Sequence, residues 1–213
     1  GPVPGLPATS LFAETHVFGA NCADAEQLTR AEFEGRRQLR ACIDMIRKYG
    51  PPDGAIGLHA IANHIGIRET RRFEAEYCLT EADVLTGREF PDAIARGSYR
   101  VDIHHPEGGG FVFKYLDGTT VSITANGTEH GRWRPATAEN PTFYSVPYRI
   151  MVHHTAPNLI MAGRMVAADR GAFGAIRVMI VLNQVGEAAG VAAALACRQK
   201  QPVTELEVKE IQH

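Results

Sequence analysis

A long run of small and apolar residues near the C-terminus constrains the fold more than any other part of this sequence. It spans Gly171 to Gln199. Closely spaced glycines stand at its N-terminal end, and they are followed by an arginine, Arg177. Several small side chains recur at three- and four-residue spacings, which share one side of a helix: Gly186, Ala189, Gly190 and Ala193. The pattern predicts one long helix with a flat flank that packs closely on a sheet or on another helix.

The first turn of such a helix exposes backbone N–H groups and the positive end of the helix dipole. These groups favour a phosphate, a carboxylate or an electron-rich ring edge. Gly174 at the entrance would let the backbone approach a ligand, because no Cβ stands in the way. An ordinary buried helix after a glycine turn is the other interpretation, and the run by itself does not decide between them.

Composition argues against several classes of protein. With 22 basic and 24 acidic residues, the net charge of −2 gives no general attraction to nucleic acid or to an anionic membrane. The longest apolar run, Ile176 to Leu182, contains Arg177 and is far shorter than a membrane span. Four cysteines lie far apart without a CxxC pair, which favours buried reduced thiols over zinc or disulfides: Cys22, Cys42, Cys78 and Cys197. We therefore expect a protein of the reducing cytoplasm.

Local patterns predict two helices upstream of this run. Thr29 and Glu32 have the spacing of a capping box and precede apolar residues at helical intervals, and Gly50 ends that element. Thr80 with Asp83 predicts the start of a short helix over residues 81–87.

Strand-like patterns occur in several short segments. They cover residues 10–18, 55–61, 66–77, 97–105, 111–123, 143–152 and 158–162. Within 111–123, Asp117 and Gly118 suit a type I′ hairpin turn. Residues 125–142 are expected to be loop, and those after Gln201 a last strand or disorder. Because no regular βαβ rhythm is present, the order of elements favours an α+β fold with a mixed or antiparallel sheet.

Four sequence blocks in a fixed order identify a family resemblance. GIRETRR, FPDAIARGSY, VPYR and NLIMAGR precede the C-terminal helix, while no GxGxxG, GxxxxGK[ST], GxSxG or HExxH motif is present. Together they resemble the C-terminal half of the FAD-dependent oxidoreductases of the glutathione-reductase-like flavin fold. The resemblance runs from about Thr15 to Ala196.

This resemblance implies a chain that lacks the N-terminal GxGxxG segment of the family. Its sheet would form the substrate domain, and its C-terminal strand and helix would complete a Rossmann-type FAD domain. The expected division is a flexible lead-in at 1–14, a substrate-binding and cap region at 15–157, the strand and helix at 158–200, and a tail at 201–213. The expected partners are a Rossmann-type N-terminal half, as a separate chain or fragment, and a small-molecule substrate, with an oligomer possible and with no nucleic acid or membrane.

The resemblance also places the cofactor. Gly163 and Arg164 would lie beside the flavin of FAD, and the helix N-terminus would point its N–H groups at the pyrimidine side of the ring. The residues implied at that N-terminus are Gly174, Ala175, Ile176 and Arg177.

A dense group of charges is the first candidate for binding the substrate. Arg68, Glu69 and Arg71 would form a clamp for an anion or a carboxylate near the flavin, or else a salt-bridge network between the two parts of the fold. Tyr148 and Arg149 of the VPYR block allow the same two interpretations.

Two histidine pairs are the candidates for acid–base chemistry or for a metal. Adjacent side chains on a strand point to opposite faces, so neither His104 with His105 nor His153 with His154 is suited to chelating one ion. We expect no metal, which argues against a metal-dependent hydrolase. His153 or His154 is the better candidate for a general base, and solvent-exposed loop histidines are the simpler alternative.

The combined patterns predict the substrate-binding and flavin-capping portion of an FAD-dependent oxidoreductase. It would transfer hydride from a small organic substrate to FAD, and it would be active only together with the FAD-binding half. The alternative is a non-catalytic interaction module, or an excised fragment, that binds a partner chain and performs no chemistry of its own.

Overall fold

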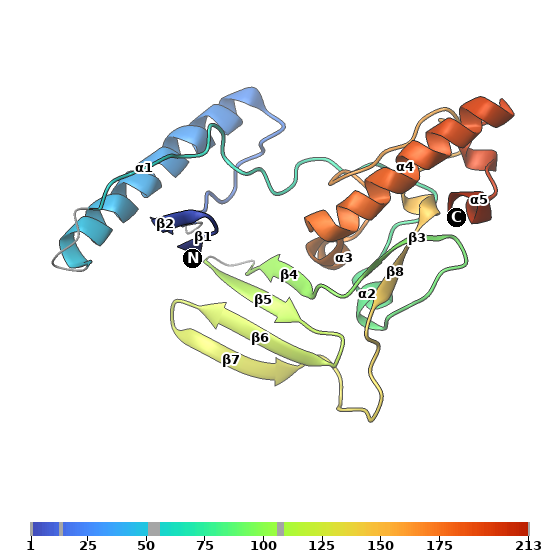
Figure 1. Cartoon of the computed structure of the whole chain (residues 1–213). Helices are drawn as coiled ribbons and strands as arrows, with labels where there is room; N and C mark the ends of the chain where they lie inside the picture. Colours follow the sequence, from blue (N-terminus) through green and yellow to red (C-terminus); the bar gives the residue numbers. More distant parts are fainter. Residues whose placement is uncertain (1, 13–14, 51–55, 106–108, 213) are drawn as a thin grey trace. The chain divides into compact units, whose positions relative to one another are not determined.

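The computed structural model describes residues 2–12, 15–50, 56–105 and 109–212. It comprises two units, Gly1–Arg71 and Arg72–His213, which are treated separately below. Figure 1 labels their helices and strands.

The first unit contains a small hairpin and one long helix. Strands β1 (Pro2–Val3) and β2 (Leu6–Ser10) pair antiparallel, in a segment expected to be a lead-in. Helix α1 (Ala25–Tyr49) confirms the predicted helix, but it begins earlier than predicted. Asp24 is its N-cap and accepts a 2.9 Å hydrogen bond from Gln27 N. The Thr29 hydroxyl instead donates to Ala25 O inside the helix, so the capping box predicted at Thr29 is wrong.

The strands predicted in this unit are also wrong. Apart from β1 and β2, its described residues pair in no ladder, including 15–18 and 56–71. Residues 13, 14 and 55 of those predictions lie outside the described parts. Ile65 packs over Gly35 of α1. A segment forms a strand only where a neighbouring strand satisfies its backbone N–H and C=O groups.

The second unit is built on a two-stranded core sheet. Strand β3 (Ala93–Gly97) pairs antiparallel with β8 (Tyr144–Pro147), and helix η1 (Tyr148–Ile150) follows β8 directly. All four residues of β8 are buried, and helix α4 (Met179–Gln199) packs against β3 (Figure 1). The strand predicted over 143–152 is therefore correct in its first part, whereas its second part is helical.

A four-stranded antiparallel sheet adjoins this core. Its order is β4 (Val101–His104), β5 (Gly110–Lys114), β6 (Thr119–Thr124) and β7 (Gly127–Arg132). The predicted hairpin is confirmed, but its turn is not type I′, because Gly118 has a positive φ of 89° and Asp117 does not. Residues 125–142, predicted as loop, contain β7, whose polar residues are all exposed and so show no apolar alternation.

Three helices, α2 (Glu81–Leu85), α3 (Arg170–Ile176) and α4, pack against these two sheets. Helix α2 confirms the predicted start, with a complete capping box between Thr80 and Asp83. The single long helix predicted from Gly174 is wrong, since α3 ends before α4 begins. Val178 between them is extended, with a ψ of 147°.

The remaining C-terminal predictions also need correction. Residues 158–162 form no strand, although Met161 N donates to Met151 O at 2.9 Å. After Gln201 the chain forms η2 (Val203–Glu205) and α5 (Val208–Ile211), which is neither a strand nor disorder. Val203, Leu206 and Ile211 anchor this tail in the core.

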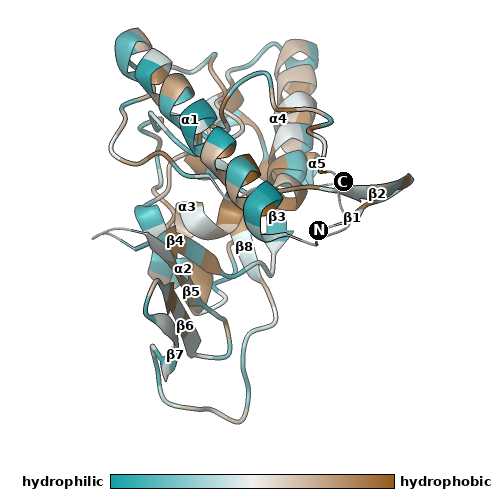
Figure 2. Cartoon of the chain, turned by 90° about the vertical axis from the view of Figure 1, so that its left-hand side faces the viewer, coloured by the Kyte–Doolittle hydropathy of each residue, from teal (hydrophilic) through white to brown (hydrophobic). Residues whose placement is uncertain are grey.

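Helix α4 is both long and apolar. By length and composition alone it would suit a membrane span, which the shorter apolar run in the sequence did not suggest. One side of α4 packs into the core through Val181, Val185, Ala188 and Ala192. Only 28% of its most apolar stretch is buried. Figure 2 shows it mostly brown and white, whereas α1 carries broad hydrophilic bands.

The combination of helices with antiparallel sheets confirms the α+β class. Completion of a Rossmann-type domain stays a prediction. All four cysteines are free, but none is fully buried, so the expectation of buried thiols is wrong.

Candidate functional site

The break between α3 and α4 is where most of the predicted cofactor-binding residues lie. Asp169 caps α3 by accepting from Ala172 N at 2.8 Å, and it also accepts from Glu81 N at the start of α2. Residues Gly171 to Ile176 are buried. A Cβ on Gly174 would lie 2.6 Å from Asp102 O, so this glycine lets α3 pack directly on β4. Gly174, Ala175 and Ile176 are therefore inside α3 and not at the start of the long helix.

The exposed helix N-terminus lies a few residues later, at the start of α4. Its N-cap, Val178, offers no side-chain cap, whereas side chains cap α1, α2 and α3. Met179 and Ile180 of the first turn are 80% and 77% exposed. Backbone N–H groups and the positive dipole end are therefore presented at Val178 to Ile180, beside an apolar surface.

Arg177 holds this junction against the four-stranded sheet. Its Nη2 donates to Asp102 Oδ2 at 3.1 Å, and the Tyr99 hydroxyl donates to the same oxygen at 3.0 Å. Burial, and then the neighbouring Asp102, raises the pKa of Tyr99. The Arg177 side chain thus joins the α3–α4 junction to β4 across 75 residues of sequence.

Gly163 and Arg164 lie in a turn, and the strand predicted before them does not form. Gly163 has a φ of 97°, with no atom within 4 Å of where a Cβ would be. Val166 N donates to Gly163 O at 3.3 Å, and Arg164 is exposed. Their predicted position beside a flavin stays a prediction.

Tyr148 and Arg149 are both engaged within the fold. The Tyr148 hydroxyl donates to Val203 O at 2.9 Å, and burial raises the pKa of this tyrosine to about 12. Arg149 forms a bidentate pair with Asp92, at 2.9 and 3.2 Å, and lies over the ring of Tyr77. Both line a hollow of about 380 Å³ next to η2 and α5. Asp92 and Arg149 both lie in the expected cap region, so their ion pair does not connect the two predicted parts of the fold, and a substrate-binding role for Tyr148 and Arg149 stays a prediction.

Arg68, Glu69 and Arg71 belong to the first unit and lie in no strand. Glu69 and Arg71 are exposed and Arg68 is half-buried. The alternation expected of a strand therefore does not apply to them.

His153 and His154 stack on each other. Their ring centroids are 4.3 Å apart and the rings are inclined by 27°, because the chain turns here and forms no strand. The expectation that the two side chains diverge is wrong for this pair. No group of three or more metal-ligating side chains occurs within the described parts of the chain.

The hydrogen bonds of His153 indicate which of its nitrogens carries a proton. Thr155 N donates to Nδ1 at 3.2 Å, and the Thr155 hydroxyl lies 2.7 Å from the same atom. In the neutral ring the proton is then on Nε2, which makes His153 a donor there. His154 is exposed, with its Nδ1 4.0 Å from Glu76 Oε1. Of the two histidines, His154 is the better placed to accept a proton.

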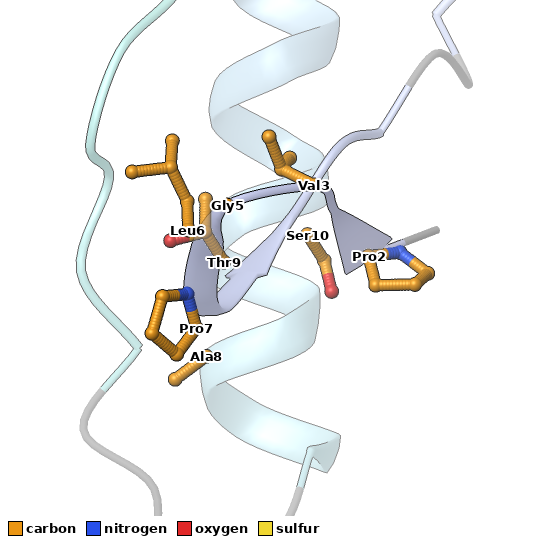
Figure 3. Close-up of a pocket in the computed structure, with 8 residues that line it drawn as sticks. All are labelled: Pro2, Val3, Gly5, Leu6, Pro7, Ala8, Thr9 and Ser10. Atoms are coloured by element: carbon orange, nitrogen blue, oxygen red, sulfur yellow. The ribbon is translucent and has the colours of Figure 1, made fainter.

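A second hollow, of about 510 Å³, lies on the N-terminal hairpin (Figure 3). The side chains that line it, from Pro2 to Ser10, include no ionisable group. It therefore offers neither an acid nor a base.

Sequence reasoning missed the acids that organise this region. Asp92, Asp102 and Asp169 each hold an arginine or a helix start. Only Asp169 carried a local signal, since an aspartate directly before a helical pattern is a common N-cap. The arginine partners of Asp92 and Asp102 lie 57 and 75 residues away.

Comparison with known proteins agrees with the resemblance seen in the sequence. A family model described as FAD dependent oxidoreductase matches residues 6–213. Neither the curated proteins nor the solved structures gave a match. Because the family model covers nearly all of the sequence, the chain belongs to the FAD-dependent oxidoreductase family.

Proposed function

We propose that this chain is the substrate-binding and flavin-capping portion of an oxidoreductase that transfers hydride from a small organic substrate to FAD. The family membership supports the general chemistry. The observation that carries the finer proposal is the uncapped, exposed N-terminus of α4, which Arg177 and Asp102 anchor to the sheet.

The residues at this junction fit one part of the cofactor. Free N–H groups at Val178 to Ile180, together with the helix dipole, suit the electron-rich edge of a flavin and favour negative charge there. When bound, FAD would accept the hydride. The sequence has no GxGxxG motif to hold the pyrophosphate. We therefore propose that a nucleotide-binding segment outside these residues completes the site.

The outer side of α4 is the surface proposed to receive that segment. Gly186 and Gly190 have open space where a Cβ would be, and Ala193 is exposed. Such a flat flank allows a sheet or helix to approach closely. In the same proposal His154 removes a proton from the substrate. A role in substrate binding for Arg68, Glu69 and Arg71, which belong to the first unit, stays a prediction.

Flavin content tests the proposal directly. The chain purified alone should hold little FAD, because it lacks a pyrophosphate cradle. Purified together with a GxGxxG-containing segment of the same family, it should yield a yellow complex with one FAD per complex. Flavin reduction by a substrate should then be slower in His154→Gln but not in His130→Gln, which changes an exposed histidine on β7.

Other outcomes would count against it. Stoichiometric flavin in the chain alone would contradict the need for a second segment. A stable but colourless complex would instead support a non-catalytic interaction module.

A further inference from the structure

One face of the four-stranded sheet is aromatic and partly open. In the register of the sheet, Phe113 lies opposite both Asp102 and Val121, and Phe111 lies opposite both His104 and Ile123. Cross-strand partners share a face, so these side chains stand together on one side of the sheet. Ile123 is 37% exposed, and the other apolar members are half-buried. We call Phe111, Phe113, Val121 and Ile123 the aromatic face.

Arg100 lies directly on this face. Its Cζ is 4.0 Å from the ring centroid of Phe113, 5.2 Å from that of Tyr99 and 5.8 Å from that of Tyr115. These cation–π contacts stabilise the guanidinium over the rings. The side chain is therefore held in place by rings and not by a carboxylate.

No hydrogen bond or ion pair to Arg100 is present in the parts of the chain that the structure covers, and its Nε is buried without a partner. The Nε of Arg177 is also buried without a partner, but Arg177 and other arginines of the unit form ion pairs through another nitrogen or through the whole guanidinium. Arg88, Arg149 and Arg177 each pair with an aspartate. Asp102, two residues along from Arg100, accepts from Arg177 and Tyr99. A buried N–H group without an acceptor is costly, so Arg100 calls for explanation.

We propose that Arg100 binds the carboxylate of a small organic acid whose apolar body rests on the aromatic face. The two terminal Nη groups of Arg100 are not among the buried atoms without a partner. A guanidinium stacked on a ring keeps these terminal N–H groups available, and their edge matches a planar carboxylate in a bidentate pair. Arg100 and Arg177 together with Asp102 carry one net positive charge, which also favours an anion.

The same site has a place in the proposed reaction. Asp102 joins the face that carries Arg100 to the junction that presents the α4 N-terminus. An acid held by Arg100 would therefore be the oxidisable substrate, which makes the substrate class a small carboxylic acid. This assignment rests on the proposed function, whereas binding of the acid by this chain does not.

The test uses phenylacetate as the probe and the full chain as the protein. Titration calorimetry should show saturable binding, and the Nε–H signal of Arg100 in ¹H–¹⁵N spectra should shift with it. Phenylacetamide has the same ring but no charge and should bind at least about tenfold more weakly. Arg100→Gln should lose about tenfold or more in affinity, and Arg100→Lys should recover part of it, because the charge returns without the bidentate edge.

Arg96→Gln is the matched control. Arg96 also lies over a ring, with its Cζ 4.8 Å from the Phe143 centroid, but it is exposed and away from the aromatic face. Its affinity for phenylacetate should equal that of the wild type, and circular dichroism should show that each variant is folded.

Three results would overturn the site: no saturable binding by the wild type, unchanged binding in folded Arg100→Gln, or an equal loss in Arg96→Gln. If binding depends on Arg100 but the FAD-loaded complex oxidises no carboxylic acid, the binding site is supported and the assignment of the acid as substrate is contradicted. If no FAD complex forms while Arg100-dependent binding persists, the proposed function fails and the site still stands.

Discussion

At the scale of single residues, Asp83 is an acid with several hydrogen-bond partners. It is 6% exposed and accepts hydrogen bonds from the Tyr77 hydroxyl, from Thr80 and from Arg88. Burial alone would raise the pKa of Asp83, but these hydrogen bonds outweigh burial and lower it. The charged carboxylate is therefore the form that the fold stabilises.

This lowered pKa predicts a pH-dependent contribution to stability. The contribution is fully present above the unfolded-state pKa of about 3.9 and is lost as the pH falls through the lower folded-state pKa. Asp83→Asn should reduce the free energy of unfolding by about 2 kcal/mol at pH 7. Its difference from the wild type should shrink below about pH 4. Urea unfolding between pH 7 and pH 3 measures this, with exposed Glu187→Gln as the control. A difference that stays constant with pH would contradict the assignment.

The side-chain contacts of a residue could be predicted from the sequence where the partner is close in the sequence. Thr80 and Asp83 were found because a capping box spans four residues. Asp102 and Arg177 were not connected, since their pairing depends on how a strand and a helix junction far apart in sequence pack together.

At the scale of elements, two helical glycines have opposite environments. A Cβ at Gly174 would meet backbone atoms of Asp102 at 2.6 to 3.1 Å, whereas nothing lies within 4 Å of a Cβ at Gly186. Gly174 therefore serves the packing of α3 on β4. Gly186 keeps α4 smooth on its outer side.

Alanine substitutions should separate these two roles. Gly174→Ala should reduce the free energy of unfolding by about 1–3 kcal/mol, because α3 must move away from β4. Gly186→Ala should raise it by about 0.5–1 kcal/mol, since alanine is the better helix former. Thermal and urea unfolding of the chain alone measure both. Equal effects of the two substitutions would show that the close approach at Gly174 is unimportant.

The elements themselves were predicted unevenly. The β5–β6 hairpin and α2 follow from local patterns and were found. The break between α3 and α4 was missed because an apolar helical pattern continues through it. The strands predicted over 55–61 and 66–77 had suitable residues, but their described residues pair with no strand. Phe73 N and Tyr77 N instead donate to Met165 O and Arg149 O, which lie outside strands.

At the scale of the whole molecule, the hydrophobic core belongs to the second unit. Every member of the large buried cluster lies between Leu79 and Ile211. Among the described residues of the first unit, only Ala31 is buried. The free energy that holds the chain folded therefore resides mainly in residues 72–213.

Truncation tests this distribution. A chain of residues 72–213 should unfold cooperatively, with a midpoint within a few degrees of the full chain, because its core is intact. Residues 1–71 alone should show no cooperative transition, since they bury too little apolar surface to offset chain entropy. Differential scanning calorimetry of both fragments measures whether each has a cooperative unfolding transition and at what temperature. Loss of the transition in 72–213 would mean that the first unit stabilises the second.

The polar strand β7 has a consequence for how the protein behaves at high concentration. It pairs with β6 along one side, and no described strand pairs along its other side. The unpaired backbone groups of an edge strand can pair with strands of other molecules, and such pairing leads to aggregation. Glu129, His130 and Arg132 place charge and polarity on this edge, and two glycines lower its tendency to extend a sheet. The lack of apolar residues that hid β7 from the sequence pattern also protects the sheet from polymerisation.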